Sequence, residues 1–122
     1  MSIENINISD SEMEIMVVLW NSKEPITSAE IGKAVEKRGW KKTTIATFLT
    51  RLVEKGVVST EKKGKIYYYT PIIPVEEYRK EKTKSIISNF YHGSVKEFAV
   101  SLFENEKLSK EDLEELRAIF DN

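Results

Sequence analysis

Basic and hydroxyl-bearing side chains are concentrated in the middle of the chain. Residues 37–65 hold nine lysines or arginines against two glutamates, a net charge of +7, whereas the whole 122-residue chain carries −1. Ammonium and guanidinium groups attract phosphates, and a threonine offers a hydroxyl to a base edge and a methyl group to a thymine methyl. These residue types suit contact with a polyanion such as nucleic acid. The residues that we assign to this contact are Lys41, Lys42, Thr43, Thr44, Ala46, Thr47, Thr50, Arg51, Lys62, Lys63 and Lys65.

Other chemistries lack the residues that they need. The chain has no cysteine and a single histidine, His92, which excludes thiolate metal sites, cysteine nucleophiles and multi-histidine metal sites. The sequence shows no glycine-rich phosphate loop and no inferable histidine–carboxylate pair. We therefore expect no enzyme activity, no metal and no cofactor. Without a signal-peptide pattern or an apolar run of about 18 residues, we expect a soluble cytoplasmic protein.

Capping signals locate the helices that must position the basic residues. Ser9-x-x-Glu12 and Thr27-x-x-Glu30 are capping boxes, each followed by apolar residues at helical spacing. The second helix is predicted to bury Ile31, Ala34 and Val35. A third helix is predicted to begin after residue 40 and to end near Gly56. Its apolar face consists of Ile45, Phe48, Leu49, Leu52 and Val53, which leaves the threonines and Arg51 on the opposite face.

The sequence period changes after the third helix. Residues 57–61 and 65–70 are rich in β-branched and aromatic side chains and flank Lys62-Lys63-Gly64, which predicts a hairpin with a basic tip. The side chains of Tyr67, Tyr68 and Tyr69 must alternate between the two faces of a strand. We therefore expect core packing and one exposed ring from these tyrosines, rather than a platform for base stacking.

The last part of the chain is predicted to be helical. Helices are expected over about 75–91, from Ser94 to the region of Phe103, and from Ser109 onward. Three amphipathic helices in about 50 residues are thinly apolar for an isolated domain, so we expect them to complete their core with a second copy. The residues that we assign to dimerisation are Tyr78, Ile86, Phe90, Phe98, Leu102, Leu113, Leu116 and Phe120.

The order of three helices, a hairpin and three more helices predicts a mainly α fold. The first half has the order of a winged helix-turn-helix, in which the third helix enters a DNA major groove and the hairpin tip, or wing, lies along the backbone. We therefore predict a DNA-binding domain at residues 1–73 and a three-helix dimerisation domain at 74–122. A merely solvated third helix is the alternative, but β-branched residues are poor choices for an exposed helix surface.

Three blocks of residues resemble a known family. Residues 8–20, Trp40–Ile45 and Thr50–Gly56 are similar to the penicillinase-repressor family that includes BlaI, MecI and CopY. Phe103–Ser109, with Glu114-Glu115-Leu116, is similar to its β-lactam-responsive branch. The resemblance implies a homodimeric repressor of β-lactamase or related resistance genes. It also implies double-stranded operator DNA with palindromic TACA/TGTA-type half-sites as partner, and C-terminal helices that interlock in the dimer.

The resemblance also implies how repression ends. In the β-lactam branch, a membrane sensor metalloprotease triggers cleavage of the repressor at an Asn–Phe bond in the dimerisation domain, directly or through a downstream protease. The matching bond in this sequence is Ser101–Leu102, where both central residues differ and the flanking residues are retained. A second departure is Ala46, at a position where the family commonly has arginine. The copper-sensing branch uses a cysteine cluster that this chain lacks.

Two other functions stay open at the level of sequence. A winged-helix regulator can release DNA when it binds a small effector, which requires an apolar pocket between its two halves. A winged-helix module can also bind proteins alone. The +7 segment argues against this module, because a protein-binding wing has no need of Lys62, Lys63 and Lys65 together.

Overall fold

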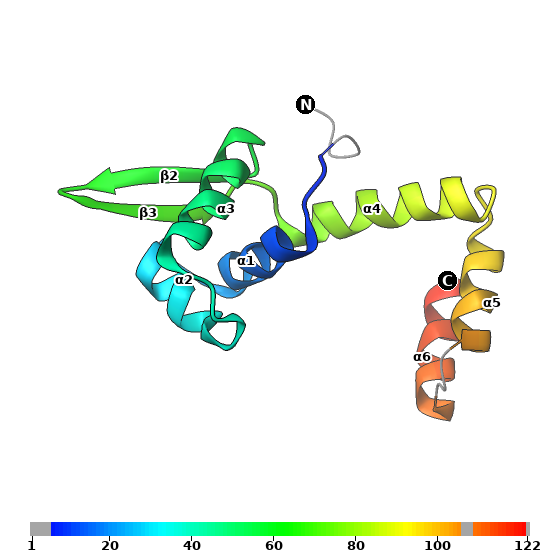
Figure 1. The fold of residues 1–122 in the computed structure, drawn as a ribbon. Helices are drawn as coiled ribbons and strands as arrows, with labels where there is room; N and C mark the ends of the chain where they lie inside the picture. The colour runs from blue at the N-terminus through cyan, green and yellow to red at the C-terminus, as the bar shows by residue number, and fades with distance from the viewer. Residues whose placement is uncertain (1–5, 106–108, 122) are drawn as a thin grey trace. The chain divides into compact units, whose positions relative to one another are not determined.

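The computed structural model of the chain describes residues 6–105 and 109–121. Three helices and a hairpin are followed by three further helices, as the sequence predicts, and the fold is mainly helical (Figure 1). In chain order the elements are α1 (Asp10–Asn21), β1 (Ile26–Thr27), α2 (Ser28–Ala34), the 3-10 helix η2 (Glu36–Arg38), α3 (Lys42–Glu54), β2 (Val58–Lys63), β3 (Ile66–Pro71), α4 (Val75–Phe90), α5 (Val95–Asn105) and α6 (Lys110–Asp121).

The chain divides into two compact units, one up to Glu81 and one from Lys82 onward. The division falls inside α4 because Tyr78 is buried against Trp20 of α1, with ring centroids 5.6 Å apart. The Trp20 indole also donates from Nε1 to the Ile73 carbonyl at 2.8 Å. The sequence pattern changes after residue 73, whereas packing keeps the beginning of α4 with the first unit.

Both predicted capping boxes are present and begin α1 and α2. Ser9 Oγ accepts from the Glu12 backbone N–H at 3.2 Å, and Glu12 Oε1 accepts from the Ser9 backbone N–H at 2.9 Å. Thr27 and Glu30 make the same reciprocal pair at 3.2 and 3.1 Å. Each box satisfies backbone donors that a helix N-terminus otherwise leaves unpaired, so the two helices begin at residues that the sequence specifies.

A three-stranded antiparallel sheet in the order β1-β3-β2 completes the first unit. β2 and β3 form the predicted hairpin, with Val58 opposite Pro71 at its base and Lys63 opposite Ile66 at its tip. Gly64, in the turn, has a φ of 64°, which L side chains rarely adopt. The sequence pattern does not predict β1, because two residues give no alternation to recognise.

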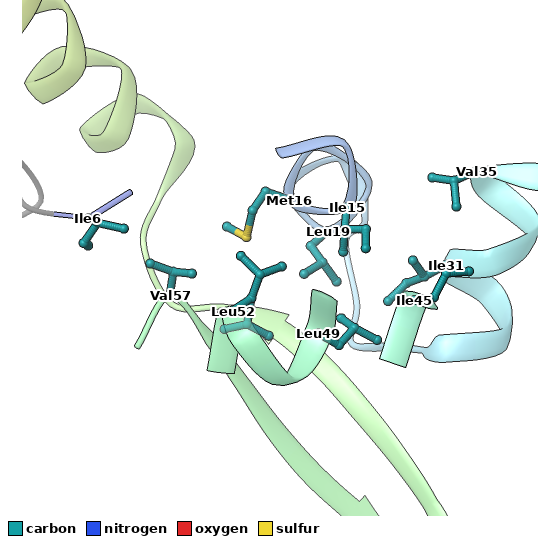
Figure 2. Close-up of a cluster of buried hydrophobic side chains, with 11 residues drawn as sticks. Ile6, Ile15, Met16, Leu19, Ile31, Val35, Ile45, Leu49, Leu52 and Val57 are labelled. Carbon is teal, nitrogen blue, oxygen red and sulfur yellow. The ribbon is translucent and has the colours of Figure 1, made fainter. Parts of the chain in front are cut away.

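The core of the first unit lies between α1, α2, α3 and the base of the sheet (Figure 2). Side chains from the three helices point toward one another, and Ile6 and Val57 close one end. The prediction that α2 buries Ala34 is wrong: Ala34 is exposed, because Ile31 and Val35, four residues apart, already cover the core. The eleven buried members are Ile6, Ile15, Met16, Leu19, Ile31, Val35, Ile45, Leu49, Leu52, Val57 and Val58.

Among the described side chains, fewer hydrophobic residues are buried in the second unit than in the first. From Lys82 onward, Ala99 is the one hydrophobic residue buried among the side chains that the structure describes. Tyr91 and Phe98 pack edge to face, with centroids 5.4 Å apart. No helix within the described residues is long and apolar enough to cross a membrane. The large hydrophobic side chains left exposed in this unit are Ile86, Phe90, Val95, Val100 and Phe103.

Candidate nucleic-acid interface

α3 presents two chemically different faces. Ile45, Leu49 and Leu52 are buried in the core and fix the helix against α1 and α2. The opposite face is open, as predicted, because the 3.6-residue period places the remaining positions away from the core. The exposed residues of this face are Lys42, Thr43, Ala46, Thr47, Thr50, Arg51 and, in the last turn, Glu54, with Thr44 half-buried at its edge.

The threonine hydroxyls of α3 are oriented by the helix itself. Thr47 Oγ1 donates to the Thr43 carbonyl and Thr50 Oγ1 donates to the Ala46 carbonyl, each at 2.9 Å. Because the hydroxyl proton is engaged with the preceding turn, each oxygen faces outward as an acceptor beside its methyl group. This face therefore offers acceptors to base amino groups and methyl contacts to thymine.

The N-terminus of α3 suits an anion. Lys41 is the N-cap residue and makes no side-chain capping hydrogen bond, and the first turn holds no acidic residue. The first backbone N–H groups of the helix thus lack a side-chain cap beside the exposed Lys41 and Lys42. Free N–H groups and the helix dipole both favour a phosphate at such a position.

The wing carries three exposed cations at its tip, Lys62, Lys63 and Lys65. Tyr67 is 47% exposed, whereas Tyr68 and Tyr69 are half-buried and Tyr69 packs against the core, so the three tyrosines give the expected core packing and one exposed ring. Desolvation by burial, with a smaller contribution from Tyr67, raises the pKa of Tyr69 above its ordinary value. The wing is therefore held against the core at Tyr69 and carries three cations at its tip.

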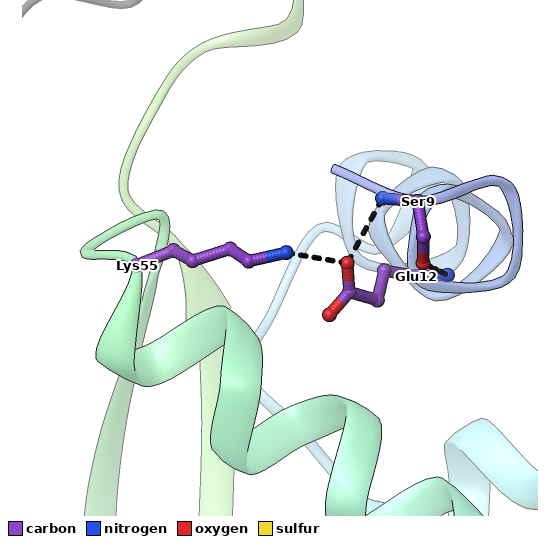
Figure 3. A network of polar contacts seen from close by, with 3 residues as sticks. All are labelled: Ser9, Glu12 and Lys55. Carbon is purple, nitrogen blue, oxygen red and sulfur yellow. Dashed lines mark hydrogen bonds and ion pairs between the residues drawn. The ribbon is translucent and has the colours of Figure 1, made fainter. Parts of the chain in front are cut away.

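Two cations of the basic segment, Arg38 and Lys55, form ion pairs with acids of α1. Arg38 contacts both carboxylate oxygens of Glu14, at 2.7 Å from Nε and 2.6 Å from Nη2. Lys55 Nζ donates to Glu12 Oε1 at 2.6 Å and ties the C-terminus of α3 to the N-terminus of α1 (Figure 3). Glu12 is 1% exposed; burial raises its pKa, but hydrogen bonds from Lys55 and Ser9 outweigh burial, so the net pKa lies below the ordinary value.

An aromatic contact holds the turn before α3. The Arg38 guanidinium lies 5.7 Å from the centre of the Trp40 ring, and Trp40 meets Phe48 of α3 edge to face at 5.1 Å. Arg38 thus connects Glu14 of α1 to the aromatic pair that supports the open face of α3. A count of charges along the sequence misses this role, because it does not show which cations are paired with acids elsewhere in the chain.

The match to known proteins covers almost the whole chain. The profile of the family described as penicillinase repressor matches residues 8–122. The chain belongs to the penicillinase repressor family. It is 34% identical to the penicillinase repressor of Bacillus licheniformis, over 93% of this chain and 89% of that protein. It is 29% identical to the methicillin resistance regulatory protein MecI of Staphylococcus aureus, over 98% and 97% of the two chains.

Solved structures of a member of this penicillinase repressor family share the fold of the first unit. The DNA-binding domain of the repressor BlaI aligns with a TM-score of 0.53 at 37% identity, over 63% of this chain and 92% of that one. The monomeric form of Bacillus licheniformis BlaI, in complex with the blaP half-operator, aligns with a TM-score of 0.51 at 38% identity, over 60% and 89%. The predicted winged helix-turn-helix is confirmed.

The residues that the sequence pattern assigns to dimerisation fall into different environments. Tyr78 is buried within the first unit of the same chain, so its ring is already covered. Ile86 and Phe90 are exposed, whereas Phe98 and Leu102 are half-buried. The side chains of Leu113, Leu116 and Phe120 lie outside the part of the chain whose side chains the structure describes.

The bond that the sequence resemblance assigns to cleavage, Ser101–Leu102, lies within α5. Ser101 and Leu102 are both half-buried. Ser101 Oγ donates to the Phe98 carbonyl at 2.7 Å and shares a hydrogen bond with the Tyr91 hydroxyl at 3.0 Å. No group of three potential ligands for a metal ion occurs in the described part of the chain.

Proposed function

We propose that the chain is a homodimeric repressor that binds a palindromic operator of β-lactamase or related resistance genes. The observation that carries the proposal is the open face of α3, where threonine acceptors and methyl groups lie between cations and the one carboxylate of the helix, Glu54, comes only in its last turn. The half-operator complex of BlaI, a relative of similar fold, supports duplex DNA as the ligand. Base edges are read by threonines, and phosphates are contacted by lysines.

The contact surface would divide into two kinds of residue. Thr43, Thr44, Thr47 and Thr50 face the bases, with Ala46 among them as a small side chain that permits close approach. Where relatives have arginine, Ala46 removes one charged contact and leaves discrimination to its neighbours. The residues that would contact phosphates are Lys41, Lys42, Arg51, Lys62, Lys63 and Lys65.

The open apolar side chains of the second unit support dimerisation. Phe90 is 74% exposed and Ile86 is 43% exposed, which is unusual for large hydrophobic residues so close together in one helix. A second copy would cover them, and a symmetric dimer would engage two half-sites of a palindrome at once. The second contact then forms at high effective concentration, so operator affinity depends on the dimer.

Induction would lower operator affinity by weakening the dimer. Cleavage at Ser101–Leu102, by a membrane sensor metalloprotease or a protease that follows it, would detach the end of α5 and all of α6. The DNA-contacting residues would be unchanged, but the dimer would lose part of its interface. The repressor would then leave the operator because two separate half-site contacts are much weaker than one bivalent contact.

DNA binding is tested with an inverted repeat of TACA/TGTA type and a scrambled duplex of the same composition. A dimer that neutralises on the order of 6–10 phosphates should lose roughly 10³–10⁵ in affinity between about 50 and 200 mM salt. Thr47→Ala should remove about 1–3 kcal/mol of discrimination between the two duplexes. Lys63→Gln should instead weaken binding to the two duplexes equally. A flat salt response, or identical behaviour of the two variants, would contradict the proposal.

The induction step is tested with a chain that ends at Ser101. Sedimentation should show a monomer, operator binding should be lost at concentrations where the full chain binds, and tryptophan fluorescence should report a folded first unit. Trp20 and Trp40, the two tryptophans of the chain, both lie in that unit. A truncated chain that stays dimeric and binds operator like the full chain would show that cleavage at this bond is the wrong mechanism.

A further inference from the structure

Each of two lysines at the wing tip lies over a tyrosine ring. Lys62 Nζ is 5.5 Å from the centre of the Tyr67 ring, and Lys63 Nζ is 5.4 Å from the centre of the Tyr68 ring. Both distances are within the range in which the electron-rich face of an aromatic ring attracts an ammonium group. Among the described residues, no carboxylate forms an ion pair with either lysine.

The strand register places the two pairs on opposite faces of the hairpin. Lys62 is directly opposite Tyr67, so these side chains share one face. Lys63 is opposite Ile66, and Tyr68 lies two residues beyond Ile66 in the same strand, so Lys63 and Tyr68 share the other face. One ammonium is therefore held on each side of the ribbon.

A lysine held by a ring differs from a lysine free in solution. A long flexible side chain loses rotamer freedom when it contacts a phosphate, and this loss opposes binding. A ring that already restricts the side chain removes part of that opposition, and the ammonium keeps its charge because cation–π contact does not neutralise it. Both lysines remain exposed, so their outer hydrogens are open to a ligand.

We propose that Tyr67 and Tyr68 are positioning residues that hold Lys62 and Lys63 toward phosphates on two sides of the wing. The wing would then contact the two backbone strands that border a groove, rather than lie flat on one strand. This inference rests on the proposed function, since duplex DNA is the ligand that supplies two parallel rows of phosphates. Lys65 has no such ring partner among the described contacts and serves as the internal comparison.

The test is a double-mutant cycle in the full-length chain on a random-sequence duplex, where phosphate contacts dominate. Tyr67→Leu should weaken binding by about 2- to 5-fold per wing, or about 4- to 25-fold for a dimer with two wings. Tyr67→Phe keeps an aromatic face and should bind within about 2-fold of the parent chain. In a Lys62→Gln background, Tyr67→Leu should have no further effect. The Tyr68 and Lys63 cycle should give the same pattern.

A second readout needs no DNA. Side-chain methylene resonances of Lys62 should be shifted upfield by the Tyr67 ring in the free protein, and this shift should vanish in Tyr67→Leu and persist in Tyr67→Phe. Tryptophan fluorescence should show the same unfolding midpoint for the parent chain and the Tyr67 variants, since Tyr67 is half-exposed near the wing tip.

The outcomes separate the possible failures. A Tyr67→Leu effect that persists without Lys62 would mean that the ring itself contacts DNA, and positioning would be wrong. Coupling on one face alone would overturn the two-sided wing. Parent-level binding by Tyr67→Leu and Tyr68→Leu would overturn the proposal while leaving the repressor function intact. Absence of duplex binding by the parent chain would instead overturn the proposed function, and this inference with it.

Discussion

The two units of the chain differ in how many of their described apolar side chains are buried. The first unit encloses eleven hydrophobic residues between three helices and a sheet. The second unit buries Ala99 among its described side chains and leaves Phe90 74% exposed. The first unit thus has the interior of an independent domain, whereas the described part of the second unit exposes the apolar side chains that the proposed dimer would cover.

This difference in burial matches the two roles that we propose, DNA contact for the first unit and dimerisation for the second. A rigid core is needed where α3 must present threonines and lysines at fixed positions, because base readout depends on hydrogen-bond geometry. An open apolar face is needed where the stability of a unit is to depend on a partner, since association then sets how much of the protein can bind. The repressor that we propose, switched by loss of its dimer, would require both properties in one chain.

The largest expected effect comes from truncating a buried side chain in the core of the first unit. Leu49→Ala removes a side chain that is 1% exposed on the inner face of α3. We expect the free energy of unfolding of the first unit to fall by about 2–5 kcal/mol, independent of protein concentration. Urea denaturation followed by tryptophan fluorescence measures this loss. Val17→Ala, at an exposed position of α1, is the control and should stay within about 0.5 kcal/mol.

The next largest effect should appear in the second unit and should depend on protein concentration. Phe90→Ala should weaken the dimer by about 1.5–3 kcal/mol for each ring that the partner covers. Sedimentation equilibrium measures the shift in dimer dissociation, while urea denaturation of the first unit should be unchanged. If Phe90→Ala instead lowers the stability of a monomeric chain as Leu49→Ala does, the contrast between the two units is wrong.

A smaller effect should follow from breaking the ion pair that joins α1 to α3. Lys55→Met leaves the buried Glu12 carboxylate without its cationic partner and with the hydrogen bond from the Ser9 backbone N–H, at a cost of about 1–3 kcal/mol. Because the pKa of Glu12 in the folded chain lies below its ordinary value, the pair stabilises the parent chain above the unfolded pKa and loses this contribution as pH falls through the folded pKa.

The measurement for this pair is the free energy of unfolding between about pH 3 and pH 6. The parent chain should gain stability as pH rises through this range, and Lys55→Met should gain less. Lys33→Met, which removes an exposed lysine of α2, is the matched control and should keep the parent slope. An equal slope in Lys55→Met would show that the pair does not control the titration of Glu12.

Local signals of the sequence predicted the elements well. The boxes at Ser9 and Thr27 give the beginnings of α1 and α2, because a capping box is specified within four residues. The period of α3 gives its buried and open faces, so most of the candidate DNA surface follows from sequence. Ala34 shows the limit of this approach, since a small residue fits either side of a short helix and the pattern alone assigned it to the core.

Contacts between distant residues could not be predicted in the same way. Lys55 and Glu12 are 43 positions apart, and Arg38 and Glu14 are 24 apart, so nothing local marks them as partners. Both cations count toward the +7 segment in the sequence, although the fold turns them toward α1. The Lys62–Tyr67 pair required the register of the hairpin, which the sequence predicts only as a hairpin.

The smallest effect concerns the opening of α5 at the proposed cleavage bond. A protease must unfold several residues around Ser101 and Leu102, because a helix does not fit an extended active-site cleft. The hydrogen bond between Ser101 and the Tyr91 hydroxyl connects α5 to the residue after α4 and opposes this opening. Tyr91→Phe removes that bond and keeps the ring that packs on Phe98, without changing the composition of any helix.

Loss of one such bond is worth about 0.5–1.5 kcal/mol, so the open population of α5 should rise about 2- to 10-fold in Tyr91→Phe. When opening and closing are fast, cleavage by a non-specific protease follows that population. Limited proteolysis with mass spectrometry should therefore show about 2- to 10-fold faster cutting within α5. Tyr67→Phe, in the wing of the first unit, is the matched control and should be cut within α5 at the rate of the parent chain. Equal rates for all three chains would mean that this bond does not hold α5 closed, and that its opening is limited by the apolar contacts around Phe98 and Leu102.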